Sequence, residues 1–233
     1  MSSLTSPAIP LVIAFDLDGT LVDTAPDLLD TLDLVLREQG VAPVDRDLSR
    51  TMIGAGARAL IVRALEQAGV VPTPADMDAM MRRFLDHYAA HIADGSRPFP
   101  GLIAALDRLS ANGARLAVCT NKTERLARLL LDKLDLTARF AAITGADTYA
   151  RSKPDPLPLH ATIAACGGQI TRSVMVGDSA TDVATAKAAG VPSIAVTFGY
   201  TEIPAARLGA DRLISHYDQI DEAVEALVAA GPS

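Results

Sequence analysis

The chain of 233 residues is short of cysteine, of long apolar runs and of basic residues, and each shortage excludes a class of protein. Cys119 and Cys166 are too few for a disulfide scaffold and form no CxxC pair, which favours a location in the reducing cytoplasm. No apolar run approaches the ~18 residues of a membrane helix, so we expect no membrane partner. With 21 basic against 28 acidic residues, the net charge of −7 argues against a nucleic-acid partner.

Apolar residues are plentiful, at 49% of the chain, which excludes a largely disordered protein. The length suits one large domain, or a core that carries an inserted subdomain. The apolar segment at residues 9–15 could pass for the middle of a signal peptide. However, no Lys or Arg precedes it, and Asp16 and Asp18 follow it at once. We therefore interpret this segment as a buried strand.

Strand and helix patterns alternate along most of the chain, which predicts an α/β fold with an open parallel, Rossmann-like sheet. The predicted strands are residues 11–15, 115–120, 141–144, 173–177, 193–196 and 212–214, and the predicted helices are 102–111, 123–133, 156–166, 180–189 and 218–229. Residues 24–97 show helix patterns only, at 26–39, 46–52, 57–68 and 75–93. We expect a catalytic core at 1–22 and 98–233, and a helical cap subdomain at 23–97 with hinges near both boundaries.

Two carboxylates, Asp16 and Asp18, follow the first predicted strand. At positions i and i+2 they project to the same side of an extended chain, at the sheet edge where open α/β proteins bind ligands. Such a pair is costly unless a cation or a proton neutralises part of its charge. The alternative is a solvated turn, because Asp and the following Gly19 are common in turns.

Further polar residues follow other predicted strands. Asp178 and Asp182 are spaced i, i+4 on one helix face, although Asp178 could instead be a plain helix N-cap. Thr120 and Asn121 offer a hydroxyl and backbone N–H groups at a helix start, which is a natural anion site. Lys153 precedes a proline and is thereby biased away from helix; taken alone, it could be an ordinary solvated lysine.

Taken together and in this order, these residues resemble the four motifs of the haloacid dehalogenase-like superfamily of phosphotransferases. The matching segments are Asp16-Leu17-Asp18-Gly19-Thr20, Thr120-Asn121, Lys153-Pro154 and Gly177-Asp178-Ser179-Ala180-Thr181-Asp182. Stretches at residues 21–28, 53–57, 153–156 and 196–200 are similar to bacterial phosphoglycolate phosphatases. Those enzymes have Asn between two cap glycines, where this chain has Ala55.

The resemblance implies a phosphomonoesterase that works through an aspartyl-phosphate, with Asp16 as nucleophile and Asp18 as general acid and base. It implies Mg²⁺ as the cofactor, held by the Asp16 carboxylate, the Asp18 backbone carbonyl and Asp178. Asp182 is implied to orient a metal-bound water or Lys153. The residues implied to hold the phosphoryl group are Thr120, Asn121 and Lys153.

The implied substrate is a small phosphorylated metabolite, 2-phosphoglycolate, and we expect a monomer or a weak dimer. The candidates for contacting its carboxylate are Gly54, Ala55, Gly56 and Arg58, although Arg58 could be a solvated helix arginine. A phosphatase for sugar phosphate or pyrophosphate, a β-phosphoglucomutase-like mutase and a non-catalytic binding protein stay open as alternatives. A dehalogenase is disfavoured, because the dehalogenase site resembles this one without the second carboxylate, Asp18.

Overall fold

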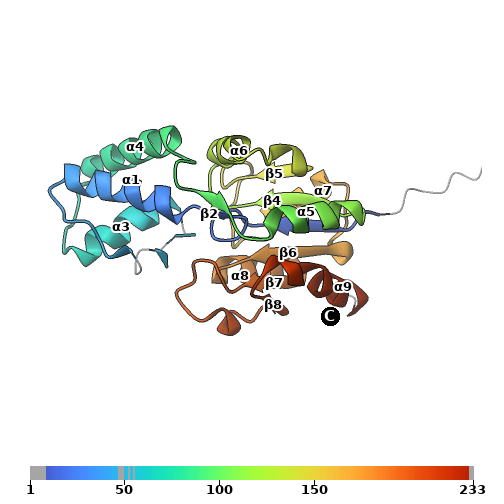
Figure 1. Cartoon of the computed structure of the whole chain (residues 1–233). Coiled ribbons are helices and arrows are strands. Elements are labelled where there is room, and N and C mark those ends of the chain that lie inside the picture. Colours follow the sequence, from blue (N-terminus) through green and yellow to red (C-terminus); the bar gives the residue numbers. More distant parts are fainter. Residues whose placement is uncertain (1–8, 47–49, 52, 55, 231–233) are drawn as a thin grey trace, which may run out of the picture.

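The computed structural model describes residues 9–230 except 47–49, 52 and 55, and it has a larger sheet-containing lobe beside a smaller helical lobe (Figure 1). The strands of the larger lobe are β1 (Val12–Phe15), β4 (Arg115–Cys119), β5 (Ala142–Thr144), β6 (Ser173–Gly177), β7 (Ser193–Val196) and β8 (Arg212–Ile214). They form one parallel sheet in the order β5-β4-β1-β6-β7-β8. The predicted α/β fold with an open parallel sheet is confirmed.

Helices cover both faces of the sheet, which explains why strand β1, in the middle of the sheet, is apolar at every position. The helices of this lobe are α5 (Leu102–Ala111), α6 (Glu124–Lys133), α7 (Leu157–Ala165), α8 (Ala180–Ala189) and α9 (Ile220–Ala230). Because side chains alternate along a strand, Ile13 and Phe15 pack into a cluster with α5, α6 and α9. Val12 and Ala14 pack into a second cluster with α7 and α8. The last helix starts two residues later than predicted, because Tyr217–Gln219 form a 3₁₀ turn.

The smaller lobe consists of helices, as the pattern of residues 24–97 predicts. They are α1 (Ala25–Glu38), α3 (Ala57–Gln67) and α4 (Pro74–Ala90). The predicted helix at residues 46–52 lies partly outside the described residues. Helix α4 begins at a capping box, in which Thr73 and Asp76 each bind the other's backbone N–H. It ends three residues before the prediction, at Ala90.

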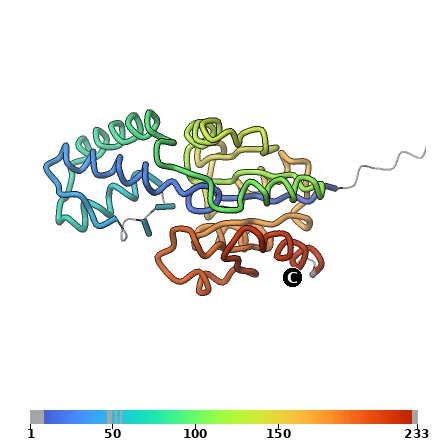
Figure 2. The backbone as a smooth tube through the Cα atoms, viewed as in Figure 1, coloured from blue at the N-terminus to red at the C-terminus, as the bar shows by residue number. Residues whose placement is uncertain are grey.

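An unpredicted two-stranded antiparallel ribbon joins the lobes. It pairs β2 (Val22–Asp23) with β3 (Arg97–Pro98), and the two segments run side by side between the lobes in Figure 2. Buried Asp27 fastens the start of α1 to the returning chain, because its carboxylate accepts the N–H groups of Gly95 at 2.7 Å and Ser96 at 2.8 Å. The predicted domain boundaries fall inside this ribbon, and they stay a prediction, as do the hinges.

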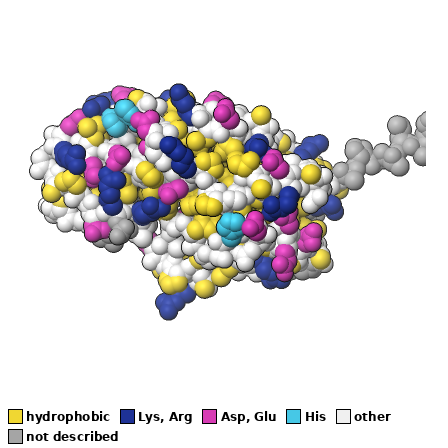
Figure 3. All heavy atoms as spheres, viewed as in Figure 1, with side chains coloured by type: hydrophobic (Ala, Val, Ile, Leu, Met, Phe, Trp, Pro, Cys, Tyr) yellow, Lys and Arg dark blue, Asp and Glu magenta, His cyan; other side chains and the backbone are white. Residues whose placement is uncertain are grey.

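Charged side chains of both signs are interspersed on the face seen in Figure 3. The apolar sides of the cap helices turn inward, so that residues such as Leu60 in α3 and Phe84 in α4 are buried. No helix in the described part of the chain is both long and apolar enough to cross a membrane.

Candidate active site

Three neighbouring strands bring the acidic and polar motifs together. Because β1 lies between β4 and β6, the residues that follow these strands meet at one edge of the sheet. These residues are Asp16, Thr120 and Asp178, and all three are buried. The structure thus places side by side segments that lie more than 50 residues apart in the sequence.

Lys153 reaches the same edge from the segment between β5 and α7. Its ammonium lies 3.0 Å from Asp16 Oδ1 and 2.5 Å from Asp182 Oδ1, and its carbonyl accepts a hydrogen bond from Asn121 Nδ2 at 3.1 Å. Burial alone would lower the pKa of Lys153, but the Asp16 and Asp182 carboxylates raise it above its ordinary value. Lys153 is therefore a buried, permanently charged group and not a solvated lysine.

The carboxylate of Asp16 is incompletely neutralised. Burial raises the pKa of Asp16 to about 6, while the Lys153 charge acts in the opposite direction. Among the described residues, the polar contact of Asp16 Oδ1 is the ion pair with Lys153. A buried carboxylate oxygen with so few partners is suited to meet an electrophile.

Asp178 is held by contacts to two loops. Its carboxylate accepts the Thr20 hydroxyl at 3.3 Å and the Tyr200 backbone N–H at 2.5 Å. Gly19, at φ +80°, and Gly199 pack so closely against Asp178 that a Cβ atom on either glycine would overlap it. Burial, followed by the Asp182 and Asp16 charges, raises the pKa of Asp178 above its ordinary value.

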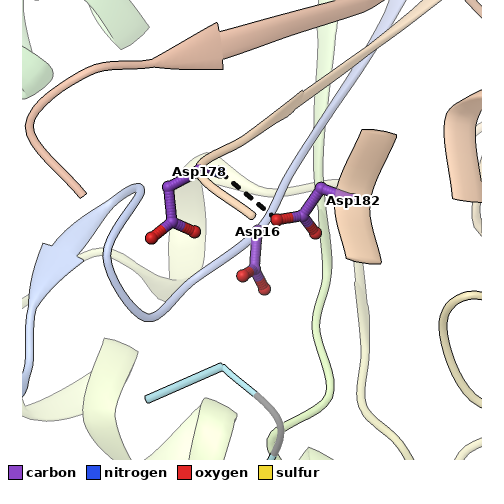
Figure 4. A group of neighbouring side chains, drawn as sticks. All are labelled: Asp16, Asp178 and Asp182. Atoms are coloured by element: carbon purple, nitrogen blue, oxygen red, sulfur yellow. Dashed lines mark hydrogen bonds between the residues drawn. The ribbon is translucent and has the colours of Figure 1, made fainter. Parts of the chain in front are cut away.

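Asp182 also has both oxygens engaged, and one of them holds a cation. Its Oδ2 accepts the backbone N–H groups of Asp178 at 3.2 Å and Ser179 at 3.0 Å, while Oδ1 holds Lys153. In Figure 4 the Asp16 and Asp178 carboxylates point the same way, whereas that of Asp182 turns toward the backbone of Asp178. Asp182 therefore positions Lys153 and the loop that carries Asp178.

The three carboxylates fit a divalent cation. Asp16, Asp178 and Asp182 each offer an oxygen atom within 4.8 Å of the others. When ionised, they carry three negative charges against the one positive charge of Lys153, and a hard ion such as Mg²⁺ prefers oxygen ligands. Asp182 holds the Lys153 ammonium on one oxygen and accepts three hydrogen bonds on the other, whereas Asp178 Oδ1 accepts the Thr20 hydroxyl at 3.3 Å. Asp16 and Asp178 are therefore the better candidates for direct ligation.

Lys122 is a site residue to which the sequence reasoning gave no role. Its ammonium lies 2.7 and 2.8 Å from the two carboxylate oxygens of Asp18, its side chain is 5% exposed, and it lies 4.8 Å from the centre of the Tyr88 ring. Burial would lower the pKa of Lys122, but the Asp18 charge raises it above its ordinary value. The sequence did contain a signal. Lys122 lies just after β4, and β4 is the neighbour of β1, the strand that precedes Asp16 and Asp18.

A cavity of about 170 Å³ lies between this sheet edge and the cap. The core side contributes Asp16, Asp18, Thr120, Asn121, Lys122, Thr123 and Leu126, and the cap side contributes Leu28, Ile53, Gly54, Gly56, Ala57, Leu60, Met81, Phe84, Leu85 and Tyr88. Both predicted cap glycines therefore reach the cavity, whereas Ala55 lies outside the described residues. Arg58 does not line the cavity; its side chain is 62% exposed and lies 3.7 Å from Asp78.

Tyr200 connects this site to the cap. Its backbone N–H binds Asp178, and its hydroxyl accepts the Ala25 N–H at 2.9 Å and donates to Asp23. Arg50 binds both oxygens of Asp23 at 3.1 Å, with its guanidinium 5.3 Å above the Tyr200 ring. Burial, and then Asp23, raises the pKa of Tyr200, so the hydroxyl stays a donor. No role for Tyr200 follows from the sequence alone.

Comparison with known proteins identifies the family. Residues 13–196 match the model of the haloacid dehalogenase-like hydrolases, whose phosphatases generally use Mg²⁺. A phosphoglycolate phosphatase of Agrobacterium fabrum is 49% identical over 97% of both chains, and one of Caulobacter vibrioides is 45% identical over 95% of this chain and 93% of its own. The crystal structure of a predicted phosphoglycolate phosphatase from Haemophilus somnus has a TM-score of 0.86 and 30% identity, covering 92% of this chain and 97% of its own. This chain belongs to the haloacid dehalogenase-like hydrolase family.

Proposed function

We propose that this protein is a Mg²⁺-dependent phosphatase that hydrolyses 2-phosphoglycolate to glycolate and phosphate through an aspartyl-phosphate. The observation that carries the proposal is that the carboxylates of Asp16 and Asp18 line one cavity, each beside its own buried lysine. The relatives named phosphoglycolate phosphatase, which match nearly the full length of this chain, support the choice of substrate. The cytoplasmic location and the monomer or weak dimer stay predictions.

A covalent route suits this reaction, because uncatalysed hydrolysis of a phosphate monoester is among the slowest known. An aspartyl-phosphate divides the hydrolysis into two easier steps. Asp16 is the nucleophile in our proposal, since among the described residues its Oδ1 is engaged by the Lys153 ammonium and by no other donor. Lys153, 3.0 Å away, offsets the repulsion between the carboxylate and the incoming phosphate.

The phosphoryl oxygens require donors, and the turn after β4 supplies them. The Thr120 hydroxyl accepts the Lys122 backbone N–H at 3.2 Å, which leaves its own proton free to donate. Asn121 uses one amide N–H for the Lys153 carbonyl and keeps the other. We infer that Thr120, Asn121 and Lys153 together bind the transferred group.

Asp18 lies two residues beyond the nucleophile and lines the same cavity. In this mechanism it gives a proton to the leaving oxygen of glycolate and then takes one from the water that hydrolyses the aspartyl-phosphate. Asp16, Asp178 and the Asp18 backbone carbonyl would hold Mg²⁺, which when bound supplies positive charge that offsets the negative charge of the phosphoryl group. Asp182 keeps Lys153 in place throughout.

A steady-state substrate panel tests the proposal. We would measure kcat/KM with Mg²⁺ for 2-phosphoglycolate, pyrophosphate and β-glucose 1-phosphate, with Asp16→Asn as the matched inactive control. We expect 2-phosphoglycolate to give the highest value and the variant to lose turnover. A higher kcat/KM for either other substrate would refute the substrate, and near wild-type kcat in Asp16→Asn would refute the nucleophile.

A further inference from the structure

We propose that Lys122 and Tyr88 bind the carboxylate of the substrate, and so select phosphate esters whose carboxylate is attached to the carbon next to the bridging oxygen. This inference rests on the proposed phosphatase function and deepens it, because it names the groups that distinguish one monoester from another.

A carboxylate needs a partner to enter this cavity, because the cap wall is formed largely by apolar side chains such as Leu28, Leu60 and Phe84. Among the described residues that line the cavity, Lys122 is the cation. No arginine is among the described residues that line the cavity. Of the cap arginines nearest to it in sequence, Arg58 lies 3.7 Å from Asp78 at the surface, Arg50 binds Asp23 and Arg63 is paired with Glu202.

Two hydrogen-bond donors at the cavity are not engaged by a second acidic group. The Lys122 ammonium has three N–H groups and donates to the two oxygens of Asp18. Apart from Asp18, its neighbour among the described residues is the Tyr88 side chain. Among the described residues, no carboxylate, carbonyl or hydroxyl accepts a hydrogen bond from the buried Tyr88 hydroxyl, although such groups are rarely left unpaired. Both residues line the cavity, and the Lys122 ammonium lies 4.8 Å from the Tyr88 ring centre.

The position of Lys122 relative to Asp18 matches the chemistry of a phosphorylated 2-hydroxy acid. In 2-phosphoglycolate a single methylene separates the bridging oxygen from the carboxylate. Asp18 serves the bridging oxygen in the proposed mechanism, and the Lys122 ammonium lies 2.7 Å from the nearer oxygen of Asp18. A substrate with its bridging oxygen at Asp18 therefore brings its carboxylate within reach of Lys122. An ester with one more methylene places the carboxylate farther away.

The test compares 2-phosphoglycolate with ethyl phosphate, which has the same skeleton without the carboxylate. We would measure kcat/KM for both esters in Lys122→Met, in Tyr88→Phe and in Arg58→Met, a control that removes an exposed cap cation. In the first two variants the ratio of 2-phosphoglycolate to ethyl phosphate should fall about 10–200-fold, the scale of one hydrogen bond to a charged group. In Arg58→Met the ratio should not change.

If Lys122→Met fails to fold, Tyr88→Phe still tests the inference, because it removes a hydroxyl that no acceptor pairs with among the described residues. Lys122→Arg, which retains the charge, should keep more of the ratio than Lys122→Met does. Equal losses on both esters in Lys122→Met, with an unchanged ratio in Tyr88→Phe, would overturn the inference and leave Lys122 as a partner of Asp18 only. If wild-type protein itself shows no preference for 2-phosphoglycolate, the proposed function fails instead.

Discussion

The charge of Asp16 should destabilise the folded, metal-free protein at neutral pH. Burial raises the pKa of Asp16 from 3.8 to about 6, so between these values the folded chain holds a proton that the unfolded chain has lost. The free energy of unfolding therefore decreases as pH rises through this window. Below pH 3.8 the destabilisation by the ionised Asp16 carboxylate is absent. Across the whole titration, a pKa difference of this size lowers the free energy of unfolding by about 3 kcal/mol.

Asp16→Asn removes this titration while it keeps the size of the side chain. Measured by urea unfolding in EDTA, the free energy of unfolding of the variant minus that of wild type should increase by about 2 kcal/mol between pH 4 and pH 7. Adding Mg²⁺ at pH 7 should stabilise wild type more than Asp16→Asn.

Two outcomes would refute this reasoning. A difference between Asp16→Asn and wild type that does not change from pH 4 to pH 7 would mean that the Asp16 carboxylate is not raised in pKa by its burial. A difference that decreases over the same range would mean that the folded protein stabilises the charged carboxylate, as expected if Lys153 outweighed burial.

Other predictions concern the remaining site and hinge residues. Asp18→Asn keeps its backbone carbonyl, so calorimetry should find Mg²⁺ binding intact while kcat falls ~10²-fold or more; equal loss of metal binding in Asp18→Asn and Asp178→Asn would contradict these separate roles. EDTA should abolish turnover and Mg²⁺ restore it, whereas full activity in the chelator would exclude the cation from the mechanism. Tyr200→Phe should lower the unfolding free energy by about 1–3 kcal/mol in urea, because the Ala25 N–H loses its acceptor; an unchanged midpoint would show that this bond contributes nothing. Asp27→Ala should destabilise by a similar or larger amount, because it leaves two N–H groups unpaired, and a neutral effect would argue against Asp27 as the fastening of the ribbon.

The core of the fold could be predicted because buried parallel strands leave a local trace. The strands of the sheet are short and mostly apolar, and an acidic residue comes directly after β1 and after β6. Adjacent strands then bring Asp16 and Asp178 together without further information. The ribbon of β2 and β3 escaped prediction because two-residue strands have no periodicity.

The cap residues of the site were harder to predict from the sequence, because they depend on which face of each cap helix is buried. Arg58 is close in sequence to the cavity glycines, yet α3 buries Leu60, Ile61, Ala64 and Leu65 and leaves Arg58 at the surface. The pairing of Lys122 with Asp18 spans 104 residues, and no local pattern encodes it. Contacts of this kind follow from tertiary packing alone.

Tyr200 links the Asp178 carboxylate to the base of the cap through its backbone at one end and its side-chain hydroxyl at the other. Its backbone N–H fixes Asp178, and its hydroxyl fixes Ala25 and Asp23. A displacement of the cap that pulls on the Tyr200 hydroxyl therefore also pulls on the backbone N–H that binds Asp178. By thermodynamic reciprocity, the factor by which a cap-closing inhibitor tightens Mg²⁺ binding must equal the factor by which Mg²⁺ tightens binding of that inhibitor.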